Sequence, residues 1–151
     1  MGKTTENINN IYRLSKNTHN RNSFSILLAE DDKEMRSLLA LMLRKEGYQV
    51  RECTDGVSLL DMLSSFFLPG EEHEHFDLII SDIRMPGVTG MKILMGANEF
   101  DNFPPIILIT AFGDKETHMQ AERLGAVTLF DKPFDIEEML KKVHAILLPS
   151  A

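Results

Sequence analysis

The chain has 151 residues, the size of one ordinary globular domain. With 43% hydrophobic and 26% charged residues it can bury a core beneath a solvated surface, which excludes disorder throughout. The formal charge of −7 argues against nucleic acid or an anionic membrane as a direct partner. Because Cys53 is the only cysteine, an internal disulfide is excluded and a reducing cytoplasm is the expected location.

The first 23 residues differ from the rest in charge and composition. Four basic residues stand against one acid there, so this stretch is net +3 and the remainder of the chain is net −10. Its six asparagines favour turns and coil over helix. We therefore predict a flexible polar leader over residues 1–23 and a folded domain over residues 24–151. No stretch approaches the roughly 20 consecutive apolar residues that a membrane-spanning helix needs.

From residue 24 onward, short apolar runs alternate with amphipathic stretches. The run at 25–29 predicts a buried strand, and apolar residues at helical spacing from Met35 to Leu43 predict a helix that Gly47 ends. The alternation continues with strands at 48–53, 77–81, 106–109 and 127–130, and with helices after residue 56 and over 91–98, 114–124 and 136–148. This order predicts an α/β fold, a five-stranded parallel sheet with helices on both faces.

Polar residues gather where the predicted strands end. They are Glu30, Asp31 and Asp32 after the first strand, Asp82 after the third, Thr110 (followed by the apolar Ala111) after the fourth, and Lys132 after the fifth. Because the carboxyl ends of parallel strands share one edge of the sheet, we expect these residues to lie close together. Asp32 and Asp114 precede predicted helices and are explained as helix N-caps. The other three acids have no helix start left to cap and form the candidate site.

The residue types at this edge indicate a particular chemistry. Three convergent carboxylates with neither sulfur nor histidine among them are the ligands that Mg²⁺ prefers. A carboxylate beside such an ion, with an ammonium and a hydroxyl opposite, can attack a phosphoryl group whose charge those groups share. The product would be an aspartyl phosphate.

Four segments occur in the order and at the intervals of a known family; they are ILLAEDD, DLIISDIRMPGVTG, IILITA and FDKPF. The chain from Ile26 to about Leu148 resembles the receiver domain of bacterial two-component response regulators. The resemblance implies a (βα)5 flavodoxin-like receiver fold. It also implies that Asp82 accepts a phosphoryl group from a sensor histidine kinase or a phosphotransfer protein.

The same resemblance assigns roles to the other residues of the site. It implies that Mg²⁺ or Mn²⁺ is bound by Glu30, Asp31, Asp82 and the backbone carbonyl of Arg84. It implies that the phosphoryl group is contacted by Lys132, Thr110 and the Ala111 amide. It also implies a cis peptide bond at Lys132–Pro133. We expect a signalling switch and not an enzyme; the only catalysis expected is that the protein assists its own phosphorylation and dephosphorylation. A downstream protein or an output domain would read the face made by residues 114–124, 127–130 and 136–148, with the receiver as a monomer or a phosphorylation-dependent dimer.

Two features depart from the family's pattern. Leu129 stands where the family carries a Tyr or Phe that turns inward with the threonine, and Phe130 points to the opposite face of its strand. Arg84 and Phe112, which follow the phosphoacceptor and the switch hydroxyl by two residues, flank the expected route of the hydrolytic water. Neither offers a carboxamide or carboxylate to orient that water, so we expect slow self-dephosphorylation.

Two other functions fit parts of the pattern. Phosphatases of the haloacid dehalogenase type also use an aspartate nucleophile and Mg²⁺, but they need an acid two residues later, where this chain has Arg84. A flavodoxin-like cofactor binder would need a phosphate-binding loop after the first strand, where this chain has acids that repel phosphate. The acidic, histidine-containing segment 71–75 is interpreted as a solvated loop and not as a metal site.

Overall fold

The structure is a computed structural model that describes residues 24–67 and 75–148. The leader predicted at 1–23 and nearly all of the acidic segment at 71–75 lie outside the described residues, so both interpretations stay predictions. Within the described ranges, every helix is too short or too polar to cross a membrane.

Strands and helices alternate along the described residues in the predicted order. They are β1 (Ser25–Ala29), α2 (Lys33–Lys45), β2 (Gln49–Cys53), α3 (Gly56–Phe67), β3 (Leu78–Asp82), α4 (Gly90–Ala97), β4 (Ile106–Thr110), α5 (Lys115–Arg123), β5 (Thr128–Asp131) and α6 (Ile136–Leu147). The predicted boundaries of the first strand agree with these, and the others differ by at most two residues. The third strand, for example, extends to Asp82, because that residue still pairs with Ile109 of the neighbouring strand.

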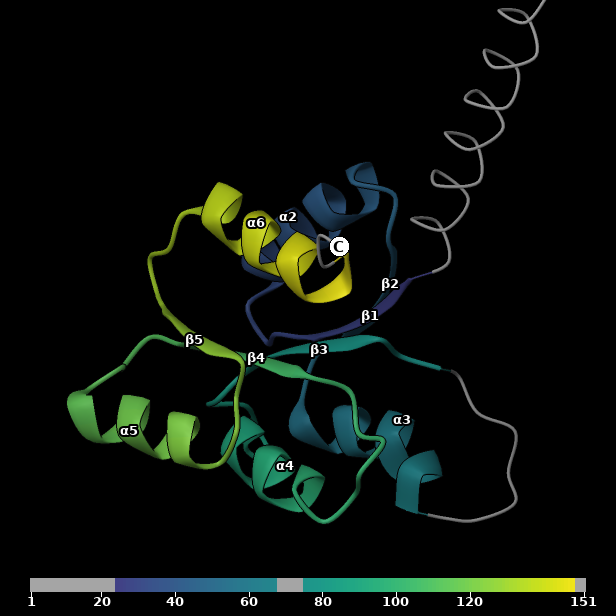
Figure 1. Ribbon diagram of the computed structural model, residues 1–151. Helices are drawn as coiled ribbons and strands as arrows, with labels where there is room; N and C mark the ends of the chain where they lie inside the picture. The colour runs from purple at the N-terminus through teal and green to yellow at the C-terminus, as the bar shows by residue number, and fades with distance from the viewer. Residues whose placement is uncertain (1–23, 68–74, 149–151) are drawn as a thin grey trace, which may run out of the picture.

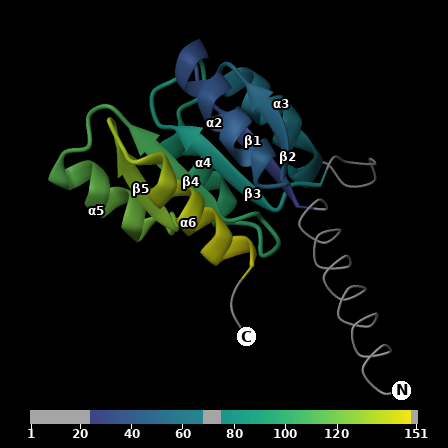
Figure 2. The same cartoon turned by 90° about the horizontal axis from the view of Figure 1, so that it is seen from above.

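The five strands form one parallel sheet in the order β2-β1-β3-β4-β5. Helices α2 and α6 cover one face of this sheet and α3, α4 and α5 cover the other (Figure 1). Figure 2 looks down on the first of these faces and shows α2 and α6 lying along the strands. The strand order reverses between β1 and β3, and the crevice beyond the carboxyl ends of these two strands is where such a sheet binds ligands.

The core is divided by the sheet into two layers. Ile26 and Leu28 of β1 pack towards α2 and α6, whereas Leu27 and Ala29 pack towards the three other helices. The central strands β1, β3 and β4 are buried on both faces, as predicted, while the edge strands β2 and β5 are partly exposed. Leu129 and Phe130 of β5 belong to opposite layers, which confirms that one cannot replace the other.

Aspartates cap the helices that begin at the site's edge of the sheet. The Asp32 carboxylate accepts a hydrogen bond from the Met35 amide at 3.1 Å, and the Asp114 carboxylate accepts one from the Thr117 amide at 2.8 Å. The hydrogen bonds from Thr117 hold the pKa of Asp114 below its usual value. Both residues are therefore N-caps, as predicted, and their caps fix the loops that carry the candidate site.

Candidate functional site

The three predicted acids come together at the reversal of strand order. Glu30 directly follows β1 and Asp82 ends β3, and these strands are neighbours with Ala29 opposite Ser81. One carboxylate oxygen from each of Glu30, Asp31 and Asp82 lies within 4.8 Å of the others. Glu30 and Asp82 are buried, whereas Asp31 is exposed. The predicted convergence of the three carboxylates is therefore present in the structure.

Lys132 joins this cluster from the end of β5. Its Nζ donates to Glu30 Oε1 at 2.5 Å and to Asp82 Oδ2 at 2.6 Å. The Lys132 amide donates to the carbonyl oxygen of Thr110 at 2.8 Å, which places the lysine beside β4. The Lys132–Pro133 peptide bond is cis, as expected. One ammonium group thus lies between two buried carboxylates.

The electrostatics of Glu30 are unusual for a glutamate. Burial, together with hydrogen bonding and charge repulsion from Asp82, raises its pKa to about 8, although Lys132 acts in the opposite direction. Burial lowers the pKa of Lys132, but the hydrogen bonds to Asp82 and Glu30 outweigh burial and leave that pKa above its ordinary value. At neutral pH the lysine is therefore charged, and Glu30 holds a proton unless a further cation offsets its charge.

One oxygen of the cluster lacks a partner among the residues that the structure describes. Within residues 24–67 and 75–148, no group forms a hydrogen bond with the buried Glu30 Oε2, an arrangement that costs free energy in a folded protein. A divalent cation would satisfy this oxygen, and three carboxylates are the hard oxygen donors that Mg²⁺ accepts. The Arg84 amide donates to Asp82 Oδ1 at 3.0 Å, which brings the peptide of residue 84 beside the cluster. The residues present therefore fit a divalent cation.

A residue that sequence reasoning missed supports the first acid of the cluster. Arg36 of α2 donates from Nη1 to the carbonyl oxygen of Glu30 at 2.8 Å, and its Nε lies 3.6 Å from Glu52 Oε1. The Arg36 side chain is only 13% exposed. It holds the peptide that links Glu30 to Asp31. In the sequence, this arginine is indistinguishable from a solvated residue on the polar face of a helix.

The hydroxyl of Thr110 is directed towards the loop that follows it. Thr110 is buried at the end of β4, and its Oγ1 accepts a hydrogen bond from the Phe112 amide at 3.1 Å. Ala111 lies between these residues and is exposed. The hydroxyl predicted to act as a switch is therefore at the same sheet edge as the acids and is bonded to its own loop.

Two exposed side chains bridge the loops that border the cluster. The guanidinium carbon of Arg84 lies 4.5 Å from the centroid of the Phe112 ring, and this ring is 64% exposed. Arg84 belongs to the β3–α4 loop and Phe112 to the β4–α5 loop. The two residues predicted to flank the water route are thus in contact through a cation–π interaction.

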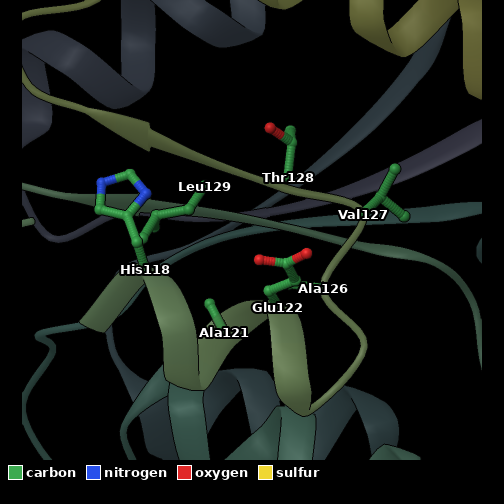
Figure 3. Close-up of a pocket in the computed structure, with 7 residues that line it drawn as sticks. All are labelled: His118, Ala121, Glu122, Ala126, Val127, Thr128 and Leu129. Carbon is green, nitrogen blue, oxygen red and sulfur yellow. The ribbon is translucent and has the colours of Figure 1, made fainter. Parts of the chain in front are cut away.

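Leu129 lies in a groove between α5 and β5 (Figure 3). The groove has a volume of about 280 Å³ and is lined by His118, Ala121, Glu122, Ala126, Val127, Thr128 and Leu129. Figure 3 shows the imidazole of His118 and the side chain of Leu129 extending towards each other. On this face of β5 the strand contributes a leucine, and the aromatic ring beside it is the imidazole of α5. The sequence places His118 on a helix but does not indicate this neighbour.

Comparison with known proteins agrees with this geometry. Residues 26–144 match the response regulator receiver domain family. The chain is 34% identical over 122 residues to sporulation initiation phosphotransferase F of Bacillus subtilis, an alignment that covers 81% of this chain and 92% of that protein. It is 36% identical over 122 residues to the C4-dicarboxylate transport transcriptional regulatory protein DctD of Pseudomonas aeruginosa, but spans only 25% of that regulator.

Solved structures share the fold. The chemotaxis response regulator CheY4 of Vibrio cholerae superimposes with a TM-score of 0.68 at 26% identity, over 82% of this chain and 98% of that one. The receiver domain of a Francisella response regulator superimposes with a TM-score of 0.73 at 22% identity, over 83% of this chain and 97% of that one. With its fold, its acidic cluster and its family match in agreement, the chain belongs to the response regulator receiver domains, the phosphorylation switches of two-component signal transduction.

Proposed function

We propose that Asp82 is the residue that becomes phosphorylated and that a phosphohistidine on a sensor kinase or phosphotransfer protein is the donor. The observation that carries this proposal is the position of Asp82: it is buried at the strand-order reversal, 2.6 Å from the Lys132 ammonium and beside two further acids. Asp31 is the more exposed acid but has neither the lysine contact nor the place at the end of a strand that Asp82 has.

The reaction is a transfer between a nitrogen and an oxygen. A carboxylate oxygen of Asp82 attacks phosphorus, a new O–P bond forms, and the N–P bond of the donor breaks. The electron pair of that bond stays on the imidazole nitrogen, which takes up a proton. The Lys132 ammonium, already bonded to Asp82 Oδ2, is in place to hold an oxygen of the arriving phosphoryl group.

Glu30, Asp31, Asp82 and the Arg84 carbonyl are the groups that would hold Mg²⁺ or Mn²⁺. When bound, such an ion neutralises negative charge on the phosphoryl oxygens and on the crowded carboxylates. The buried, unpartnered Oε2 of Glu30 supports this assignment, since a cation would satisfy it. A glutamate at the first acidic position changes the ligand geometry slightly and retains the carboxylate.

The phosphorylated state differs from the resting state mainly by charge. A phosphoryl group adds roughly −1.5 to −2 charges beside Lys132 and Thr110. We expect Thr110 to exchange its bond with the Phe112 amide for one with a phosphoryl oxygen, and the α5–β5–α6 face to rearrange in response. A downstream protein or an output domain in the cytoplasm reads that face, and the domain performs no other catalysis.

The direct test is phosphorylation by a small donor. The full chain is incubated with acetyl phosphate and Mg²⁺, and its intact mass is measured. The expected result is a mass gain of one phosphoryl group that is lost in Asp82→Asn and lost when the metal is chelated. Asp55→Asn is the matched control, because Asp55 caps α3 and asparagine caps equally well. A wild-type protein that never gains this mass contradicts the proposal and favours a receiver that works without phosphate.

A further inference from the structure

His118 of α5 and Asp131 of β5 form a contact that links two parts of the domain. His118 Nε2 lies 2.7 Å from Asp131 Oδ2, and the two side chains are 40% and 50% exposed. The residues are 13 positions apart in the chain, so their contact depends on the packing of α5 against the end of β5. The contact therefore joins two secondary-structure elements, α5 and β5.

Asp131 occupies a position next to both residues that would touch a phosphoryl group. It directly precedes Lys132 and pairs with Thr110 in the register of β4 and β5. Its carboxylate also packs against Gly113, three residues after Thr110, where a Cβ would lie 1.5 Å from Asp131 Oδ1. A side chain at residue 113 would displace this carboxylate. Asp131 therefore lies against the loop whose movement would follow that of Thr110.

His118 places its ring in the groove at the other end of the same contact. The imidazole lines the groove beside Leu129, and the small side chain of Ala121 lines it from the next turn of the same helix (Figure 3). Any movement of α5 relative to β5 changes this groove and the distance from His118 to Asp131 together. The pair thus connects the phosphorylation site to the surface between α5 and β5.

We propose that the His118–Asp131 pair is a latch that holds the Thr110 loop and α5 in the unphosphorylated arrangement. This inference rests on the proposed function and specifies how that function is regulated. A phosphoryl group on Asp82 draws Thr110 and Lys132 towards it, so the Gly113 loop and Asp131 shift and the latch opens. The bond exists only in the resting state and therefore opposes phosphorylation, since a contact made in one state alone shifts the equilibrium towards that state.

The size of the effect follows from the exposure of the pair. A contact between side chains that are about half exposed is weak, so removing it shifts the resting equilibrium by about two- to fivefold. Affinity for a phosphoryl analogue should rise by the same factor, because the analogue no longer has to break the bond.

The experiment measures the apparent Kd for beryllofluoride with Mg²⁺ by NMR titration of the full chain. We expect His118→Leu and Asp131→Ala, which each remove the hydrogen-bonding group, to bind beryllofluoride about two- to fivefold more tightly than wild type. The double variant should bind no more tightly than the better single variant, because either change alone opens the latch. A residue that served only to hold α5 in place would weaken binding or leave it unchanged.

A matched control removes a similar pair at the opposite, amino-terminal end of the strands. His75 Nε2 lies 2.9 Å from Asp77 Oδ1, before β3 begins, and His75→Leu should leave the affinity for beryllofluoride unchanged. Unchanged or weaker binding in both latch variants overturns the latch. Failure of wild type itself to bind beryllofluoride overturns the proposed function, so the two failures are distinguishable.

Discussion

Replacing Glu30 by glutamine tests the electrostatics of the site without adding a phosphodonor. Glu30 is completely buried, one of its oxygens has no partner among the described residues, and its pKa is raised from 4.5 to about 8. The folded state therefore holds the proton of the Glu30 carboxyl group more tightly than the unfolded state does. The contribution of this proton to the free energy of unfolding is complete below pH 4.5 and is lost as the pH rises through about 8. Glu30→Gln removes the ionisation and keeps the shape of the side chain.

The magnitude follows from the change in pKa. Moving the pKa from 4.5 to about 8 corresponds to at most about 5 kcal/mol of unfolding free energy lost once Glu30 is fully ionised. Glutamine replaces the charged hydrogen bond with Lys132 by a weaker neutral one, so we expect Glu30→Gln to be more stable than wild type by only about 1–2 kcal/mol at pH 9 without metal. At pH 5 wild type is itself protonated, and the difference should vanish.

The assay is thermal unfolding followed by circular dichroism at pH 5, 7 and 9. For a chain of this size the expected gain at pH 9 is about 2–8 °C in Tm. Adding Mg²⁺ should stabilise wild type and leave Glu30→Gln almost unaffected, because the variant lacks one ligand. Glu34→Gln is the control, since it removes the same charge from an exposed position in the first turn of α2. A Glu30→Gln protein that is less stable than wild type at pH 9 without metal would refute the reasoning.

Three further changes are expected to have defined effects. Arg84→Asn removes the cation–π contact with Phe112 beside the site and supplies a carboxamide that can orient water. The phosphorylated protein should therefore lose its phosphate about tenfold faster, which a phosphate-release time course measures. A wild-type protein whose phosphate is already short-lived contradicts this expectation. Lys132→Met leaves the buried Asp82 carboxylate and the Glu30 carboxyl group without their cationic partner, and urea unfolding at pH 7 without metal should show a loss of about 3 kcal/mol; no loss would mean that the lysine contributes nothing to folding. Gly113→Ala places a methyl group on the Asp131 carboxylate, which is half exposed and can turn aside, so the same measurement should show a loss of no more than about 1 kcal/mol; a larger loss would mean that the carboxylate cannot move. Gly96→Ala, where no described residue lies near the added methyl group, should show no loss.

The sequence predicts the fold and the position of the acidic cluster well, for a topological reason. Strands that alternate with helices typically form a parallel sheet, and the carboxyl ends of parallel strands meet at one edge. The sequence alone therefore predicts that residues as far apart in the chain as Glu30 and Lys132 lie close together in the fold. The opposite directions of Leu129 and Phe130 follow equally from the two-residue period of a strand.

The contacts between elements were not predictable in this way. Arg36 reaches the Glu30 carbonyl, and His118 reaches Asp131, through the packing of a helix against a strand end. Local spacing carries no signal for such pairs, since each residue alone is typical of a solvated helix face. The missing partner of Glu30 Oε2 is also invisible in sequence, because it depends on the exclusion of water by neighbouring side chains.

The central claim is that the phosphoryl group resides on Asp82, and chemical trapping tests it most directly. The full chain is treated with acetyl phosphate and Mg²⁺, reduced with borohydride, digested and sequenced by mass spectrometry. Reduction converts an aspartyl phosphate into homoserine at the same position. We predict homoserine at residue 82 and aspartate unchanged at residues 31 and 55. Homoserine at either of those two residues, with residue 82 intact, would contradict the assignment.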